Sequence, residues 1–238
     1  MTDHEPSPGP DDDPSGSWFS TFLSSTPRVI GSITALIGAI SGLLIALNRV
    51  GVLGNGHPRT TSKPAESLFS PMTRPIGRVY FEGTTMYVKA AQPRTPLLLL
   101  ADQDKPLQDV AMSTSATWMS GASDYGYSLL CRYRNSRNYY LVGVLSGGRY
   151  NMARYRDGAL TSLTNGIQHS NYIDDAENDV TVRCVGDDPT TLSLEVNGRT
   201  VASVKDLTGL EGGNVGMRVG SGESTVTLRF EDFVLKYL

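Results

Sequence analysis

Apolar and polar residues follow two patterns along this chain, a long apolar block near the start and an alternating pattern through most of the rest. Residues 29–47 are predominantly apolar, contain no charged residue and lie between Arg28 and Arg49. As a helix with a rise of about 1.5 Å per residue, such a block spans the roughly 30 Å hydrocarbon core of a bilayer. We therefore predict a single transmembrane helix over residues 28–49.

Two other interpretations of this block fit the pattern less well. A signal peptide would begin with a basic segment and contain a shorter apolar run. A buried helix of a soluble domain would need a helical partner, and the rest of the pattern predicts none. Within the block, Gly38 and Gly42 form a GxxxG spacing, which permits close helix–helix approach and suggests a homodimer in the membrane.

The segments on either side of the block lack the composition of a folded core. Residues 1–27 are rich in Pro, Ser and Asp, and we predict a disordered acidic tail that ends in a short amphipathic stretch. That stretch either lies at the membrane interface or simply lengthens the anchor; its apolar residues are Trp18, Phe19, Phe22 and Leu23. Residues 50–76 contain repeated Pro, Gly, Ser and Thr, and we predict a Pro/Gly-rich tether.

From residue 77 to residue 238 the pattern changes to alternating β-branched, aromatic and polar residues, which is typical of half-buried strands. The segments predicted as strands are residues 84–90, 109–120, 125–134, 138–146, 148–156, 179–186, 190–198, 199–204, 213–219 and 224–238. Asn197-Gly198 is the clearest hairpin signal, because both turn positions favour a positive φ. Short, regularly spaced strands predict an all-β fold, an antiparallel β-sandwich.

Composition and charge narrow the function classes. The chain has 238 residues, a formal net charge of −3 and 19% charged residues, so we predict no nucleic-acid partner. His169 is the only histidine after residue 76, which leaves little for a zinc site or a Ser-His-Asp triad, and we predict neither metal nor cofactor. The acidic stretch at residues 174–179 offers oxygen ligands for calcium but lacks EF-hand spacing, and we interpret it as a solvated loop.

Four segments resemble a known family when they are taken in order. They are YGYSLLCRYRNSRNYYLVGVLSGGRYNMARY (125–155), VTVRCVG (180–186), LEVNGRTVASV (194–204) and GNVGMRVG with VTLRFEDFVL (213–220, 226–235). Together they resemble the concanavalin A-like jelly-roll domains of laminin-G-like modules and of the 3-keto-disaccharide hydrolase domain family, in versions borne by bacterial membrane proteins. The resemblance covers residues 77–238, and it implies two curved sheets, a concave face that in relatives holds a saccharide, and a location outside the cytoplasm.

No catalytic residue is predicted. Glycosidases on this fold that retain configuration need two carboxyl groups about 5 Å apart, in a Glu-x-Asp-x-x-Glu pattern, and this pattern is absent. Glu231 and Asp232 are adjacent, so on a strand they point to opposite faces. We therefore favour a protein that is not an enzyme.

A set of aromatic and basic residues is the best candidate for a ligand-binding face, because aromatic rings stack on sugars and guanidinium groups donate hydrogen bonds. The candidates are Trp118, Tyr125, Arg132, Arg134, Tyr140 and Arg154. In the alternative interpretation the aromatic residues belong to the core or its rim, and the arginines pair with nearby Asp and Glu.

The two cysteines both fall on the apolar phase of a predicted strand. Cys131 shares its phase with Leu129, and Cys184 shares its phase with Val182, so both side chains point to an apolar face. Equal phase also fits two separate buried thiols in the cytosol. The resemblance, which implies an oxidising compartment, favours a disulfide between Cys131 and Cys184.

The orientation in the membrane has two conflicting indicators. Arg28 alone precedes the apolar block closely, whereas Arg49, Arg59 and Lys63 follow it, and this bias would place the C-terminal domain in the cytoplasm. Long domains translocate largely regardless of flanking charge, and the resemblance implies the opposite side. We predict a single-pass protein of the cell membrane whose C-terminal domain is extracytoplasmic.

The sequence thus predicts a membrane-anchored, non-enzymatic binding or sensor module, with carbohydrate as the candidate ligand. One alternative is a glycoside-processing enzyme similar to the 3-keto-disaccharide hydrolases. The other is a structural partner of a membrane complex that assembles through the apolar helix.

Overall fold

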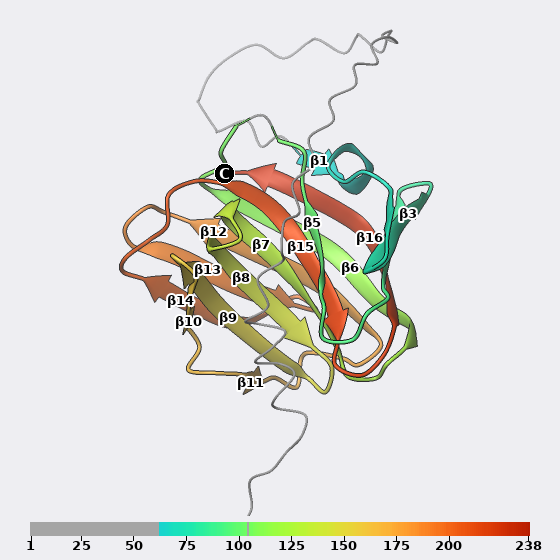
Figure 1. Cartoon of the computed structure of the whole chain (residues 1–238). Coiled ribbons are helices and arrows are strands. Elements are labelled where there is room, and N and C mark those ends of the chain that lie inside the picture. The colour runs from blue at the N-terminus through green and yellow to red at the C-terminus, as the bar shows by residue number, and fades with distance from the viewer. Residues whose placement is uncertain (1–61, 104) are drawn as a thin grey trace, which may run out of the picture.

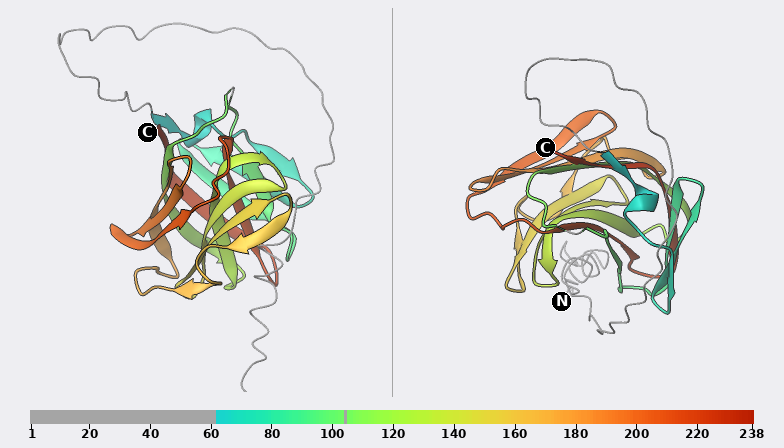
Figure 2. Two further views of the ribbon diagram at one scale, coloured as in Figure 1. Left: turned by 90° about the vertical axis from the view of Figure 1, so that its left-hand side faces the viewer. Right: turned by 90° about the horizontal axis from the view of Figure 1, so that it is seen from above.

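The computed structural model describes residues 62–103 and 105–238 and shows two antiparallel β-sheets packed face to face (Figures 1 and 2). The predicted acidic tail, the predicted transmembrane helix with Gly38 and Gly42, and the first part of the predicted tether lie outside the described residues. Within the described part, no helix has the length and apolar character needed to cross a bilayer.

One sheet has nine strands in the order β14-β13-β12-β6-β16-β4-β3-β2, with β1 paired to β16. Their bounds are β1 Ser62–Pro64, β2 Met72–Arg74, β3 Gly77–Glu82, β4 Thr85–Ala90, β6 Val110–Gly121, β12 Glu177–Val185, β13 Thr190–Val196, β14 Arg199–Asp206 and β16 Val226–Tyr237. Strands β6 and β16 form the centre of this sheet and pair along almost their whole length.

The other sheet has seven strands in the order β10-β9-β8-β7-β15-β5, with β11 paired to β9. Their bounds are β5 Leu97–Leu100, β7 Tyr125–Asn135, β8 Asn138–Leu145, β9 Arg149–Arg156, β10 Ala159–Ser162, β11 Gln168–His169 and β15 Asn214–Ser221. Figure 2 shows the two sheets as curved, stacked layers, and the hydrophobic core lies between them.

Alternation of buried and partly exposed residues explains why these segments form strands. In β13, Leu192 and Leu194 are buried and Ser193 between them is not. Every segment predicted as a strand is present, and the predicted all-β antiparallel sandwich is confirmed. The turn at Asn197-Gly198 has φ values of 51° and 72°, as the hairpin prediction requires. Among the strands that the pattern missed, β5 is a run of leucines without alternation.

Residues 62–76, which the sequence assigns to the tether, include parts of the sandwich. Strand β1 pairs with β16, and a short 3-10 turn, Ala65–Ser67, follows it directly. Phe69 is 3% exposed, and its ring packs edge-on against Phe233 with a centroid distance of 5.2 Å. The sandwich therefore begins upstream of Gly77, because three apolar residues of this Pro-rich segment, Ala65, Leu68 and Phe69, are buried in the core.

A disulfide joins the two sheets. Cys131 belongs to β7 of the seven-stranded sheet and Cys184 to β12 of the nine-stranded sheet, and both are fully buried. The Cα atoms lie 6.7 Å apart across the core. The predicted Cys131–Cys184 disulfide is therefore confirmed.

This disulfide should contribute about 4 kcal/mol to the free energy of unfolding, since it closes a loop of 53 residues. We expect the full-length C131A/C184A variant to unfold at a markedly lower denaturant concentration than the wild type. Reductant should lower the wild-type midpoint and leave the variant unchanged, as followed by tryptophan fluorescence in guanidinium chloride. A wild-type midpoint that reductant does not move would contradict this role.

Candidate functional site

A pocket of about 400 Å³ opens at one end of the sandwich, the end opposite the C-terminus. Its walls come from the end of β6, the β6–β7 loop, the start of β7, the β8–β9 turn and the loop before β12. The lining residues are Trp118, Ser123, Asp124, Tyr125, Ser146, Gly147, Arg149 and Asp175. We call this the Trp118 pocket.

Trp118 supplies the main aromatic surface of the pocket. Thr114 and Ala116 precede it on the inward phase of β6 and are buried, so Trp118 is the inward residue at which the core ends. Its side chain is 36% exposed, and its indole Nε1 donates a hydrogen bond to the carbonyl of Ala122 at 3.2 Å. The ring is thus fixed in position while part of its surface stays open to solvent.

Tyr125 and Asp175 line the pocket and are joined by a hydrogen bond. The Tyr125 hydroxyl donates a hydrogen bond to the backbone carbonyl of Asp175. Burial, together with the nearby Asp175 carboxylate, raises the pKa of Tyr125 to about 12, so the hydroxyl stays protonated as a donor. The Asp175 Oδ1 accepts a hydrogen bond from the backbone N–H of Gly147 at 2.6 Å. Two loops from different sheets are therefore tied together at this wall.

Asp124 is the carboxyl group of the pocket whose pKa is raised. Its Oδ1 is buried and has no hydrogen-bond partner. Burial and the charge of Glu223 raise the pKa of this carboxyl, although backbone N–H groups, including that of Gly222, act in the opposite direction. Arg149 lines the same pocket, and its Nε donates to the Ser146 carbonyl at 2.9 Å.

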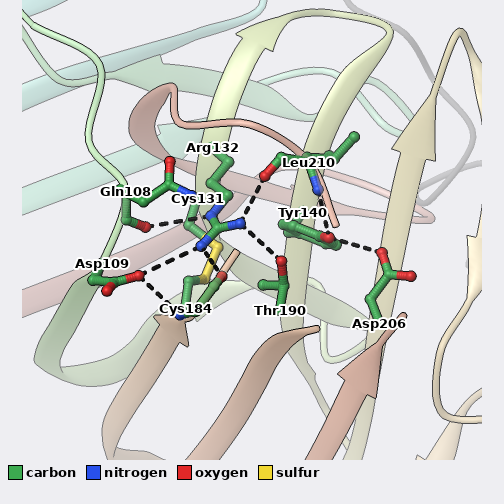
Figure 3. Close-up of a disulfide and its surroundings, with 10 residues drawn as sticks. Gln108, Asp109, Cys131, Arg132, Tyr140, Cys184, Thr190, Asp206 and Leu210 are labelled. Atoms are coloured by element: carbon green, nitrogen blue, oxygen red, sulfur yellow. Dashed lines mark hydrogen bonds and ion pairs between the residues drawn. A yellow bond between two sulfur atoms is a disulfide. The ribbon is translucent and has the colours of Figure 1, made fainter. Parts of the chain in front are cut away.

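Tyr140 and Arg154, two of the predicted ligand-binding residues, lie inside the sandwich at its other end. They are cross-strand partners on β8 and β9, and both contact the carboxylate of Asp206 at the end of β14 (Figure 3 shows Tyr140 and Asp206). The Tyr140 hydroxyl donates to Asp206 Oδ2 at 2.7 Å, and Arg154 Nη1 lies 2.6 Å from Oδ1. This network closes the space between the sheets.

The charge of Asp206 is well compensated, in contrast to that of Asp124. Burial alone would raise its pKa, but hydrogen bonds from Tyr140, Arg154 and Thr208 outweigh burial and hold the pKa below its ordinary value. The Tyr140 hydroxyl also accepts a hydrogen bond from the backbone N–H of Leu210 at 3.0 Å. The loop after β14 is thereby fastened to the seven-stranded sheet.

Arg132 is buried beside the disulfide (Figure 3). Its side chain is fully inaccessible, and it lies 3.5 Å from the Asp109 carboxylate. Its remaining acceptors are the carbonyls of Gln108, Gly186 and Leu210 and the hydroxyl of Thr190. All of these contacts are within the chain, so the position of Arg132 indicates a structural role.

Arg134 lies apart from both groups. It is exposed, forms an ion pair with Glu211 at 2.7 Å, and lines a separate cavity of about 310 Å³ together with Lys105 and Tyr133. The structure therefore brings Trp118 and Tyr125 together in one pocket and places Arg132, Arg134, Tyr140 and Arg154 outside it. The sequence interpretation missed Asp124, Arg149 and Asp175 as pocket residues, because they come from loops and turns where no periodic pattern marks a wall.

The outer face of the seven-stranded sheet bears on the enzyme alternative. Tyr139 and Tyr155 stack there with ring centroids 4.5 Å apart, and Tyr133 packs against Tyr139. The outward strand positions of β7, β8, β9 and β15 include Gly126, Ser128, Leu130, Tyr133, Tyr139, Leu141, Gly143, Leu145, Arg149, Asn151, Ala153, Tyr155, Gly216, Arg218 and Gly220. None of these positions is Asp or Glu, so a carboxylate pair for glycoside hydrolysis is absent from these described strands.

The acidic stretch at residues 174–179 is organised by hydrogen bonds within the chain. The Asn178 side chain accepts from the Asp174 backbone N–H at 2.8 Å and donates to the Asp174 carbonyl at 2.7 Å. Glu177 is paired with Arg229 at 3.8 Å. Across residues 62–103 and 105–238, no group of three or more His, Cys, Asp or Glu side chains could hold a metal ion.

The comparisons with known proteins support the fold. No family model and no curated protein matches the sequence. Among solved structures, the carbohydrate-binding module CBM66 from Bacillus subtilis aligns with a TM-score of 0.53 and 14% identity, over 69% of this chain and 92% of that chain. A β-glucanase from Bacillus licheniformis aligns with a TM-score of 0.54 and 8% identity, over 75% of this chain and 98% of that chain.

A third structure, a β-1,3-1,4-glucanase (lichenase) derived from a mouse hindgut metagenome, has a TM-score of 0.52 and 6% identity, over 75% of this chain and 98% of that chain. At such low identity these similarities concern the fold alone. They agree with the predicted concanavalin A-like jelly-roll sandwich, whereas the more specific resemblance to laminin-G-like and 3-keto-disaccharide hydrolase domains stays a prediction.

The Asp206 network yields a pH-dependent prediction. The Asp206→Asn variant leaves Arg154 partly buried without its anionic partner and should lower the free energy of unfolding at pH 7 by about 3 kcal/mol. Because the pKa of Asp206 is depressed in the folded state, this contribution is present above the unfolded pKa of about 3.9 and is lost as the pH falls through the folded pKa. Denaturant unfolding of the full chain at pH 7 and under acid conditions measures both effects.

Glu211→Gln is the matched control, since it removes an ion pair whose Glu211 side chain is 82% exposed and should change stability little. Equal midpoints for Asp206→Asn and the wild type at pH 7 would show that the network does not stabilise the fold.

Proposed function

We propose that this chain is a non-enzymatic carbohydrate-binding module and that the Trp118 pocket is its sugar site. The observation that carries the proposal is a fixed, partly exposed indole ring facing a cavity that also holds two carboxylates and a guanidinium group. Saccharides present an apolar C–H face and a ring of hydroxyl groups, so a site for them combines an aromatic surface with a few polar groups that set the orientation.

The size and construction of the pocket agree with this ligand class. A volume of about 400 Å³ lies in the range of small-molecule sites, roughly 300–1,000 Å³, and suits one or two sugar rings. The polar groups are held by hydrogen bonds within the protein, such as those between Tyr125 and Asp175 and between Asp175 and Gly147. A ligand would therefore meet a preformed site, which lowers the entropic cost of binding.

The fold neighbours support a carbohydrate ligand at the level of analogy. One is a carbohydrate-binding module and two are glucanases, and this chain shares their sandwich at low identity. We favour binding over hydrolysis for two reasons. Strands β7, β8, β9 and β15 carry no carboxylate on the outer face of their sheet. Of the two carboxylates in the pocket itself, Asp175 is tied to the backbone N–H of Gly147, as a structural residue would be.

We further propose that residues 28–49 anchor the module in the cell membrane and that the sandwich lies outside the cytoplasm. The apolar block supports the anchor, and the Cys131–Cys184 disulfide supports an oxidising compartment. A homodimer through Gly38 and Gly42 belongs to the same proposal. Protease protection of the C-terminal domain in intact cells tests the orientation.

The central test is a glycan array probed with the full chain in detergent, followed by calorimetric titration of the best ligand. Trp118→Ala should weaken binding of that ligand at least tenfold, because the sugar loses its stacking surface. Leu207→Ala is the matched control, since it removes an exposed apolar side chain at the opposite end of the sandwich and should leave the affinity unchanged.

Two outcomes would contradict the proposal. If no glycan on the array binds, or if Trp118→Ala binds as tightly as the wild type, the Trp118 pocket is not the sugar site. If the full chain hydrolyses the glycan it binds, the module is an enzyme.

A further inference from the structure

We propose that the saccharide of the Trp118 pocket carries a free amino group, so that the ligand class is a glycan of unacetylated hexosamine. This inference rests on the proposed function and adds the chemical class of the sugar. It is carried by the charge distribution and the aromatic surface of the pocket, which together suit an ammonium group.

The pocket carries more negative than positive charge. Asp124 and Asp175 both line it, and Glu223 lies close enough to raise the pKa of Asp124 through its charge. Arg149 is the one cationic side chain among the lining residues. Its Nε already donates to the Ser146 carbonyl, and further contacts engage this residue as well. A neutral sugar would leave this excess of negative charge uncompensated.

Asp124 is the group that an ammonium ligand would stabilise most. Its Oδ1 is buried and lacks a hydrogen-bond partner, and only backbone N–H groups oppose the effect of burial. No Lys or Arg is among the causes that lower its pKa. This differs from Asp206, where Arg154 donates directly to the carboxylate. At Asp124 a bound ammonium group would add a cationic partner of the kind that Arg154 provides at Asp206, beside the backbone N–H groups already present.

The aromatic surface of the pocket adds a second attraction for the same group. A cation near the face of a Trp ring is attracted by the electron density of that face, and the interaction is largest for Trp among the aromatic side chains. Trp118 is held by its hydrogen bond to Ala122, so the surface does not need to be ordered on binding. N-acetylation of the sugar would remove the charge and with it both attractions.

The pH dependence of binding follows from the same groups. The charged or titratable groups around Asp124 are Asp175, Glu223, Arg149 and Tyr125. The pKa of Asp124 is raised, so as the pH falls this carboxylate is protonated before an ordinary Asp. The preference for an amino sugar should therefore be full at neutral pH and decline as the pH falls toward the range in which carboxylates titrate.

The test is calorimetric titration of the full chain in detergent with three tetrasaccharides of the same β-1,4 linkage. They contain glucosamine, N-acetylglucosamine or glucose, and so differ only at the 2-substituent. We expect the glucosamine oligomer to bind at least tenfold tighter than either of the others at neutral pH. Asp124→Asn should reduce its affinity to that of the glucose oligomer.

Two further variants complete the design. Glu211→Gln removes one exposed negative charge far from the Trp118 pocket and should leave the preference unchanged, which excludes a general charge effect. If Asp124→Asn fails to fold, Glu223→Gln reduces the negative charge beside Asp124 without altering a lining residue, and it should lower the preference several-fold.

The possible results separate the two proposals. If all three tetrasaccharides bind equally, or if the neutral ones bind more tightly, the amino-sugar inference is wrong and the proposed function stands. If none binds and the array is also negative, the proposed function itself fails. If a lysine tetrapeptide binds as tightly as the glucosamine oligomer, the pocket recognises an ammonium group without a sugar, and the inference is overturned.

Discussion

The structure depends on a covalent link between its two sheets and on the buried arginine next to it. The Cys131–Cys184 disulfide joins β7 to β12 through the core, and Arg132 follows directly in the chain. A buried guanidinium group is costly unless its donors are satisfied. Arg132 therefore gathers acceptors from several loops, including Gly186 and Leu210, and this requirement draws those loops against the end of the sandwich that carries the C-terminus.

The two ends of the sandwich are built differently. The network of Tyr140, Arg154 and Asp206 adds to the Arg132 contacts and fills the space between the sheets there. At the end opposite the C-terminus the inward phase of β6 continues past the buried Ala116 to Trp118, which lines a pocket and remains partly exposed. Rigid strands that position loops at one end are a common basis for binding sites.

The fold could be predicted from the sequence largely because alternation reports burial directly. The strands and the inward phase of Cys131 and Cys184 follow from a period of two residues, and the Asn197-Gly198 turn follows from the tolerance of Asn and Gly for a positive φ. The site could be predicted only in part. Arg132 has a φ of 52° at an irregularity in the β7–β8 pairing, so simple alternation, which places it opposite Cys131, does not describe where its side chain goes. The pocket brings together Asp124, Arg149 and Asp175, which lie in turns and loops far apart in the sequence. A local sequence pattern does not predict which distant turns lie side by side.

Two aspartates of this chain contrast a structural role with the binding role that we propose for the Trp118 pocket. Asp206 is buried, yet hydrogen bonds from Arg154, Tyr140 and Thr208 lower its pKa. The protein itself therefore stabilises the ionised carboxylate. Asp124 is desolvated next to another acidic residue, has no cationic side chain as a direct donor, and its pKa is raised. Selection for stability alone favours the first arrangement, since an uncompensated charge destabilises the folded state. Asp124 stands in the second arrangement, beside a fixed indole ring and inside a cavity. The free energy lost by desolvating its carboxylate is of the kind that a bound cationic ligand recovers.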